Sequence, residues 1–94
     1  MSRPKPSIDP QFADEPPVSD QLTDYDYTML ICYLRLLDAA EDDADWHEVA
    51  RIVFKVDPDQ EPGRAKRMYE AHLARARWMT EQGYRHLLVE ADQE

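Results

Sequence analysis

The second half of the chain carries two helical patterns separated by a loop that no helix can cross. Asp45 and Glu48 stand three residues apart at the start of the first pattern, which is the spacing of a capping box. Apolar residues then recur at helical spacing on one face, at Val49, Ile52, Val53 and Val56. The loop 57–63 holds prolines and a glycine and ends this helix. A longer helix is expected over 64–82, with Gly83 at the position that closes it.

The first half of the chain predicts one further helix. Thr23 is expected as its N-cap, with Asp26 at the third helical position. Large apolar residues follow at helical spacing and make a wide face: Met29, Leu30, Tyr33, Leu34, Leu36 and Leu37. Acidic residues at the C-terminal end oppose the helix dipole, so we expect fraying by about Ala40. The patterns together predict an all-α fold, a small helical bundle with a helix-turn-helix-like core made of three main helices plus a short C-terminal segment.

Proline content and charge divide the chain into three parts. Residues 1–20 contain five prolines and few large apolar residues, so we expect a disordered Pro-rich arm. Residues 21–89 are expected to form the helix-turn-helix-variant domain. Within it, residues 84–89 fit either a short helix or an extended strand. Residues 90–94 are expected to be an acidic C-terminal tail.

Few side chains in this sequence favour catalysis or metal binding. His47, His72 and His86 lie far apart and are not at ligand spacing with Cys32, so we expect no metal, no cofactor and no enzymatic activity. Cys32 stands in an apolar run and is expected to be a buried structural thiol. No apolar run approaches the length of a membrane span, and the N-terminus lacks the hydrophobic region of a signal peptide. We therefore expect a cytoplasmic protein.

Charge is distributed unevenly along the chain. Residues 1–61 hold 15 acidic and 5 basic side chains, whereas residues 64–85 hold six basic and two acidic ones. A capped helix, a turn and a long basic helix form the arrangement of a helix-turn-helix reader of DNA. However, a chain with a net charge of −9 lacks the basic footprint expected of a free-standing DNA binder. The basic helix is therefore expected to contact a protein surface.

Residues 25–88 resemble a helix-turn-helix variant long catalogued as a bacterial domain of unknown function, found in regulators carried by conjugative elements. The resemblance rests on three stretches of this sequence: Leu34-Arg35-Leu36-Leu37-Asp38, Asp45-Trp46-His47-Glu48-Val49-Ala50 and Gly83-Tyr84-Arg85-His86-Leu87-Leu88. Small acidic members of that family are quorum-sensing antiactivators. The resemblance implies binding to transcriptional activators, namely a LuxR-type quorum sensor or an activator with a domain of the same family. Glu70, Ala71 and Ala74 stand where DNA-binding members tend to be basic.

These observations favour an antiactivator that binds and inhibits a transcriptional activator controlling conjugative-element transfer, as a monomer without direct DNA binding. Arg and Trp often dominate interface energies, so its partner-binding face is expected on the outer side of the basic helix, at Arg64, Arg67, Met68, Ala71, Arg75 and Trp78. Two alternatives stay open. One is a DNA-binding transcriptional regulator with helix 64–82 as its recognition helix, and the other is an unrelated small adaptor or toxin-neutralising protein.

Overall fold

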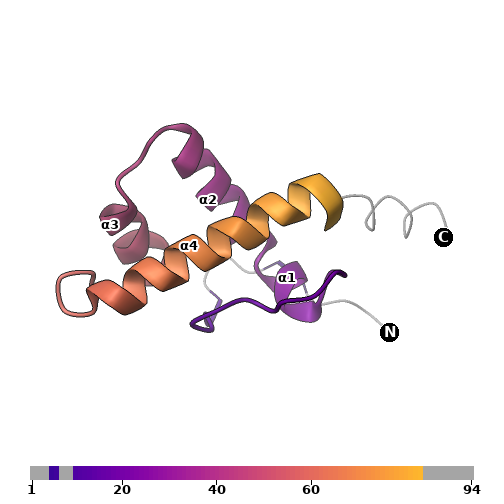
Figure 1. Cartoon of the computed structure of the whole chain (residues 1–94), viewed down its shortest axis with the longest axis horizontal. Coiled ribbons are helices and arrows are strands. Elements are labelled where there is room, and N and C mark those ends of the chain that lie inside the picture. The colour runs from indigo at the N-terminus through magenta and orange to yellow at the C-terminus, as the bar shows by residue number, and fades with distance from the viewer. Residues whose placement is uncertain (1–4, 7–9, 84–94) are drawn as a thin grey trace, which may run out of the picture.

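The computed structural model describes residues 5–6 and 10–83, and within this part every regular element is a helix (Figure 1). The elements in chain order are α1 (Asp24–Thr28), α2 (Leu30–Glu41), α3 (Trp46–Val49), the π-helical turn η1 (Ala50–Phe54), α4 (Pro62–Trp78) and a second π-helical turn η2 (Met79–Gly83). The predicted all-α bundle is therefore confirmed. The expected C-terminal segment 84–89 and acidic tail 90–94 lie outside the described residues.

A turn at Met29 divides the first predicted helix into α1 and α2. Thr23 is the N-cap of α1, as predicted: its Oγ1 accepts a hydrogen bond from the Asp26 N–H at 3.3 Å, and its own N–H donates to Asp26 Oδ2 at 2.8 Å. Met29 leaves the helical conformation, with φ −88° and ψ 1°, and its side chain is buried in the core. Helix α2 then ends at Glu41, one residue beyond the expected fraying point.

Asp45 is the N-cap of α3, as the sequence predicts. Its side chain accepts from the His47 N–H at 3.0 Å, where a capping box would use the amide of Glu48. The α-helix continues for only one turn before the chain adopts the wider π-helical hydrogen bonding of η1.

The π turn changes which side chains face the core. A π turn holds more residues than an α turn, so the apolar positions after it are rotated relative to helical spacing. Val49 and Phe54 are buried, whereas Ile52 is 74 % exposed. The predicted apolar face is therefore wrong at Ile52. Lys55, with φ 59°, ends the turn in the left-handed region, and Val56 returns to the core.

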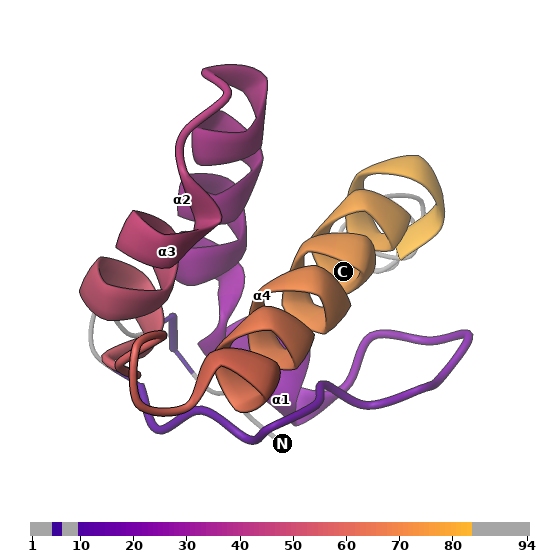
Figure 2. The same cartoon turned by 60° about the vertical axis from the view of Figure 1, so that its left-hand side comes forward.

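Helix α4 is the longest element, and α2 and α3–η1 pack against it (Figure 2). In both views α3 lies near the N-terminal end of α4. The turn 55–61 follows η1 and leads directly into α4. The order α2, α3–η1, turn, α4 is that of a helix-turn-helix-like core. The buried apolar side chains come from all these elements: Met29, Tyr33, Leu36, Val49, Ala50, Phe54, Val56, Ala65, Met68, Leu73, Ala76 and Met79.

Residues 10–20 have no regular secondary structure and lie against the helices. The ring of Phe12 contacts the ring of Phe54, with centroids 4.7 Å apart, and the ring of His72, with centroids 5.7 Å apart. We predicted a disordered arm over 1–20 from its prolines, and that pattern gives no sign of the contacts that Phe12 makes with the helices. The domain boundary at residue 20 stays a prediction.

Candidate nucleic-acid interface

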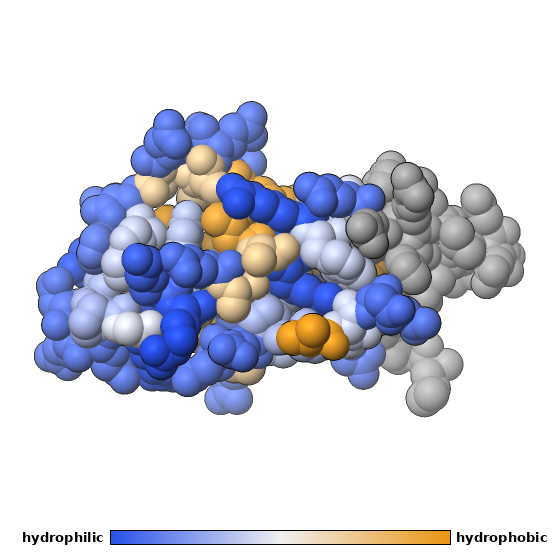
Figure 3. Space-filling model, in the orientation of Figure 1, coloured by the Kyte–Doolittle hydropathy of each residue, from blue (hydrophilic) through white to orange (hydrophobic). Residues whose placement is uncertain are grey.

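Helix α4 has a buried face and an exposed face. Ala65, Met68, His72, Ala76 and Met79 recur at helical spacing and are buried against the other helices. The opposite face carries charged side chains that reach solvent, namely Lys66, Arg67, Glu70, Arg77 and, on η2, Glu81. Hydrophilic residues also cover most of the molecular face shown in Figure 3, with apolar residues gathered toward its middle.

The six residues predicted to bind a partner do not form one exposed surface. Met68 and Arg75 are only 1 % and 7 % exposed, and of the six residues only Arg67 is exposed to solvent. Arg64, Ala71 and Trp78 are half-buried on the flank between the two faces. The physical reason is register: Met68 and Arg75 are two helical turns apart, on the same side as His72. The sequence-based placement of Met68 and Arg75 on the outer face is therefore wrong.

The chain's own N-terminal segment, residues 10–20, covers that flank of α4. The Arg64 Nε donates to Asp14 Oδ1 at 3.0 Å, and the Arg75 Nη1 donates to the Ser19 carbonyl oxygen at 2.6 Å. Between these contacts lies a groove of about 470 Å³, lined on one side by residues 15–20 and on the other by Ala71, Ala74, Arg75 and Trp78. Residues 10–20 of the same chain therefore lie against part of the surface that was predicted to bind a partner protein.

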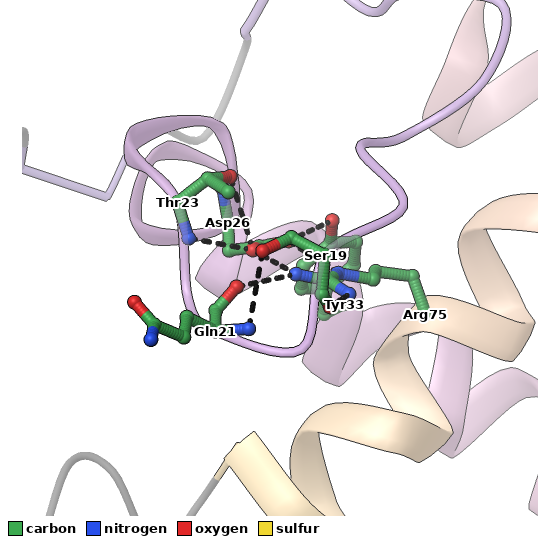
Figure 4. Close-up of polar contacts among 6 residues, drawn as sticks. All are labelled: Ser19, Gln21, Thr23, Asp26, Tyr33 and Arg75. Carbon is green, nitrogen blue, oxygen red and sulfur yellow. Dashed lines mark hydrogen bonds and ion pairs between the residues drawn. The ribbon is translucent and has the colours of Figure 1, made fainter.

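Asp26 is the centre of a buried polar cluster that holds α1, α4 and residues 19–21 together (Figure 4). Its carboxylate accepts from Arg75 Nε at 3.0 Å, from Arg75 Nη2 at 2.7 Å and from Tyr33 Oη at 2.9 Å. The Arg75 Nη2 also donates to the Gln21 carbonyl oxygen at 2.9 Å. Burial alone would raise the pKa of Asp26. The hydrogen bonds from Arg75, the Thr23 N–H and Tyr33 outweigh this effect and lower it.

The same cluster raises the pKa of Arg75 through its hydrogen bonds to Asp26, and the pKa of Tyr33 is raised by burial and by the Asp26 charge. Arg75 also lies over the ring of Trp78, 3.9 Å from its centroid. The role of this cluster is structural, because its polar side chains are turned toward one another inside the protein. From the sequence, Asp26 was predicted only to lie at the third position of a helix, after the N-cap Thr23. The spacing of Arg75 from Met68 and His72 was the available signal that it faces inward.

A second buried polar chain runs through His72. The His72 Nδ1 lies 2.7 Å from the Met68 carbonyl oxygen, which can only accept, so Nδ1 carries the proton. The Nε2 atom therefore accepts from Tyr25 Oη at 2.6 Å, and Tyr25 Oη in turn accepts from the Ala13 N–H at 3.1 Å. Burial lowers the pKa of His72, so the neutral imidazole is the form that fits this chain of bonds.

The exposed bases differ in whether they have acidic partners. Arg51 pairs with Asp59 at 3.0 Å, and Lys66 lies 3.9 Å from Glu70. Arg67 and Arg77 form no ion pair with any of the described residues. Within the described part of the chain, no salt bridge has to break before these two guanidinium groups meet an external anion.

The described part of the chain holds neither a candidate metal site nor a candidate membrane span. No group of three or more His, Cys, Asp or Glu side chains there is placed to hold a metal ion. No helix within the described ranges combines the length and apolar character needed to span a bilayer.

Comparison with known proteins gives a family. Among curated proteins no match was found. The family model described as "T6SS, Transcription factor, DNA binding domain" (RovC DNA-binding domain) matches residues 3–89. This match supports a family of DNA-binding regulator domains, and it gives no support to the expected link with quorum sensing or conjugative elements.

The prediction of a chain that acts through a protein partner without direct DNA binding is contradicted by this match. That prediction relied on the net charge of the whole chain, −9, and on Glu70, Ala71 and Ala74 in the basic helix. However, 15 of the 20 acids lie before residue 62, outside α4. Charge on a surface that faces DNA acts more strongly than charge elsewhere on a protein, because salt screens distant charges. With residues 3–89 matched, the chain belongs to the RovC family of transcription-factor DNA-binding domains.

Proposed function

We propose that this protein is a transcriptional regulator that binds duplex DNA with α4 as its recognition helix. The observation that carries the proposal is the exposed face of α4, which follows α3–η1 in helix-turn-helix order and presents Arg67 and Arg77 without acidic partners among the described residues. An α-helix fits the major groove of B-form DNA, and residues near the start of the recognition helix contact the base edges.

The residue types on this face match the chemistry of base recognition. Arg67 has a planar guanidinium that can donate two hydrogen bonds to the O6 and N7 atoms of guanine. Glu70, one turn later, can accept from the N4 amino group of cytosine. Arg77 stands farther from the start of α4 and is suited to the phosphate backbone.

The strong negative net charge should make this binding weak, and the phosphate contacts should make it sensitive to salt. Each phosphate contact releases counterions, so affinity falls steeply as salt rises, and repulsion from the acids of α1, α2 and the loops adds to the cost. The test is selection of duplexes from a random library at about 50 mM salt, followed by fluorescence anisotropy with the selected sequence. We expect enrichment of one short motif by the full chain.

Two variants of equal charge make the test specific. Arg67→Ala should weaken binding to the selected duplex by about 1–3 kcal/mol, with loss of preference at one base pair. Arg35→Ala removes an exposed arginine from α2 and should change the affinity far less. If no motif is enriched and the protein does not bind duplex DNA at low salt, DNA binding is rejected. The antiactivator role that the sequence resemblance implies would then be favoured.

A further inference from the structure

We propose that the DNA phosphate backbone and the acidic N-terminal segment compete for one flank of α4, and that Arg64 is the residue they share. In the free protein Arg64 is paired with Asp14, and in the complex it contacts a phosphate. This inference rests on the proposed function. It adds a phosphate-binding surface at Arg64, beside the exposed face of α4, and it holds that residues 10–20 weaken phosphate binding there.

The charge and position of residues 10–20 suit such competition. This segment contains three acids, Asp14, Glu15 and Asp20, and no basic residue. It runs beside α4 from Arg64 to Trp78, at the edge of the face that we assign to DNA. Negative side chains at this place repel the phosphates of a duplex that lies along α4.

Arg64 lies one turn before Arg67 on α4, so both side chains can reach the same duplex. Its Nε donates to Asp14 Oδ1 at 3.0 Å, and its Nη1 lies 3.4 Å from Glu61 Oε2. The side chains of Arg64 and Asp14 are 40 % and 61 % exposed. Water and salt screen an ion pair this exposed, so a phosphate can replace Asp14 at little cost.

The rest of the segment is held more firmly. Phe12 packs on Phe54, the Ala13 N–H is bonded to Tyr25, and the Ser19 carbonyl oxygen is bonded to Arg75 in the buried cluster. The exposed acids Asp14 and Glu15 lie between the contacts of Phe12 and Ala13 on one side and that of Ser19 on the other. The segment therefore keeps its acids beside α4, and exchange requires that Arg64 leave Asp14 and its longer contact with Glu61.

The test uses two triple variants of the full chain with the same change in net charge. Asp14→Asn/Glu15→Gln/Asp20→Asn removes the acids of the segment, and Glu41→Gln/Asp42→Asn/Asp43→Asn removes three exposed acids at the end of α2. We expect the first variant to bind the selected duplex about three- to tenfold more tightly than the second at low salt. Melting curves should show that both remain folded.

A second measurement isolates Arg64. In the wild type, Arg64→Ala should make the slope of log affinity against log salt shallower by about 0.9, the value of one lost phosphate contact. In the Asp14→Asn variant the affinity at low salt should rise, because Arg64 no longer has to leave that carboxylate. Arg64→Ala should abolish that gain. Equal affinities of the two triple variants would mean that only net charge matters and would overturn the competition while leaving DNA binding intact. Failure of every variant to bind the duplex would instead overturn the proposed function, and this inference with it.

Discussion

The carboxylate of Asp26 and the guanidinium of Arg75 form a two-point ion pair inside the protein, although they lie 49 residues apart in the sequence. The side chains are 1 % and 7 % exposed, respectively. The pair joins α1 to α4, and the remaining guanidinium hydrogen bonds go to the Ser19 and Gln21 carbonyl oxygens. A single cluster thus fixes both the helix packing and the path of the N-terminal segment.

Asp26→Asn should destabilise the protein strongly. The change leaves the Arg75 charge buried without its counterion, and breaking a buried pair in this way typically costs about 3–5 kcal/mol. Urea unfolding should show the loss. Asp24→Asn is the control, because Asp24 is exposed in the same helix and should leave the midpoint nearly unchanged. Similar midpoints for the two variants would show that the ion pair does not stabilise the fold.

His72 should make stability depend on pH. Its pKa in the folded protein lies below the ordinary value of 6.5 because of burial, so the unfolded chain binds a proton first as the pH falls. The free energy of unfolding should therefore decrease below about pH 6.5 and continue to decrease until the folded-state pKa is reached.

Urea unfolding of the wild type and of His72→Gln between about pH 7.5 and pH 5.5 would measure this contribution. The variant should show a smaller slope, whatever its stability at neutral pH. His47→Gln, which removes a half-exposed imidazole, serves as the control. An unchanged slope in His72→Gln would mean that another group carries the pH dependence.

The π turn η1 predicts an unusual pattern of mutational effects. Phe54→Ala should lower the free energy of unfolding by about 3–5 kcal/mol because it empties a buried site. Ile52→Ala should change it by less than about 0.5 kcal/mol because the side chain is already in water. Thermal or urea unfolding of the two variants would decide. A large loss at Ile52 would indicate that the segment continues as a regular α-helix.

Phe12 should anchor the N-terminal segment to the helices. Phe12→Ala removes ring contacts with Phe54 and His72, and we expect a loss of about 1–3 kcal/mol together with greater mobility of residues 10–20. Val18→Ala, a change in the same segment at a fully exposed side chain, should have no effect. Amide relaxation measurements report the mobility. High mobility of these residues already in the wild type would favour the disordered arm that the prolines predict.

Local features of the sequence determined where α1 and α3 begin. Thr23 and Asp45 act as N-caps through hydrogen bonds from amides two or three residues away, and Pro62 stands at the first position of α4, where its missing N–H costs nothing. The predicted loop 57–63 is therefore two residues too long at this end. The effects of the caps and of Pro62 need no distant partner. The all-α class and the order of the helix-turn-helix core follow from them together with the apolar spacing.

The direction in which side chains on α4 face was decided by tertiary structure. Arginine is expected in solvent, and Arg75 is stable in the interior only because Asp26, on a different helix, compensates its charge. The π turn likewise shifts Ile52 outward although the spacing of its neighbours places it in the core. The binding face predicted on α4 combined buried and exposed residues because the burial of Met68 and Arg75 depends on contacts with other helices. Which side of a helix becomes a surface depends on contacts between residues far apart in the sequence, and these contacts also placed the acidic N-terminal segment beside the bases of α4.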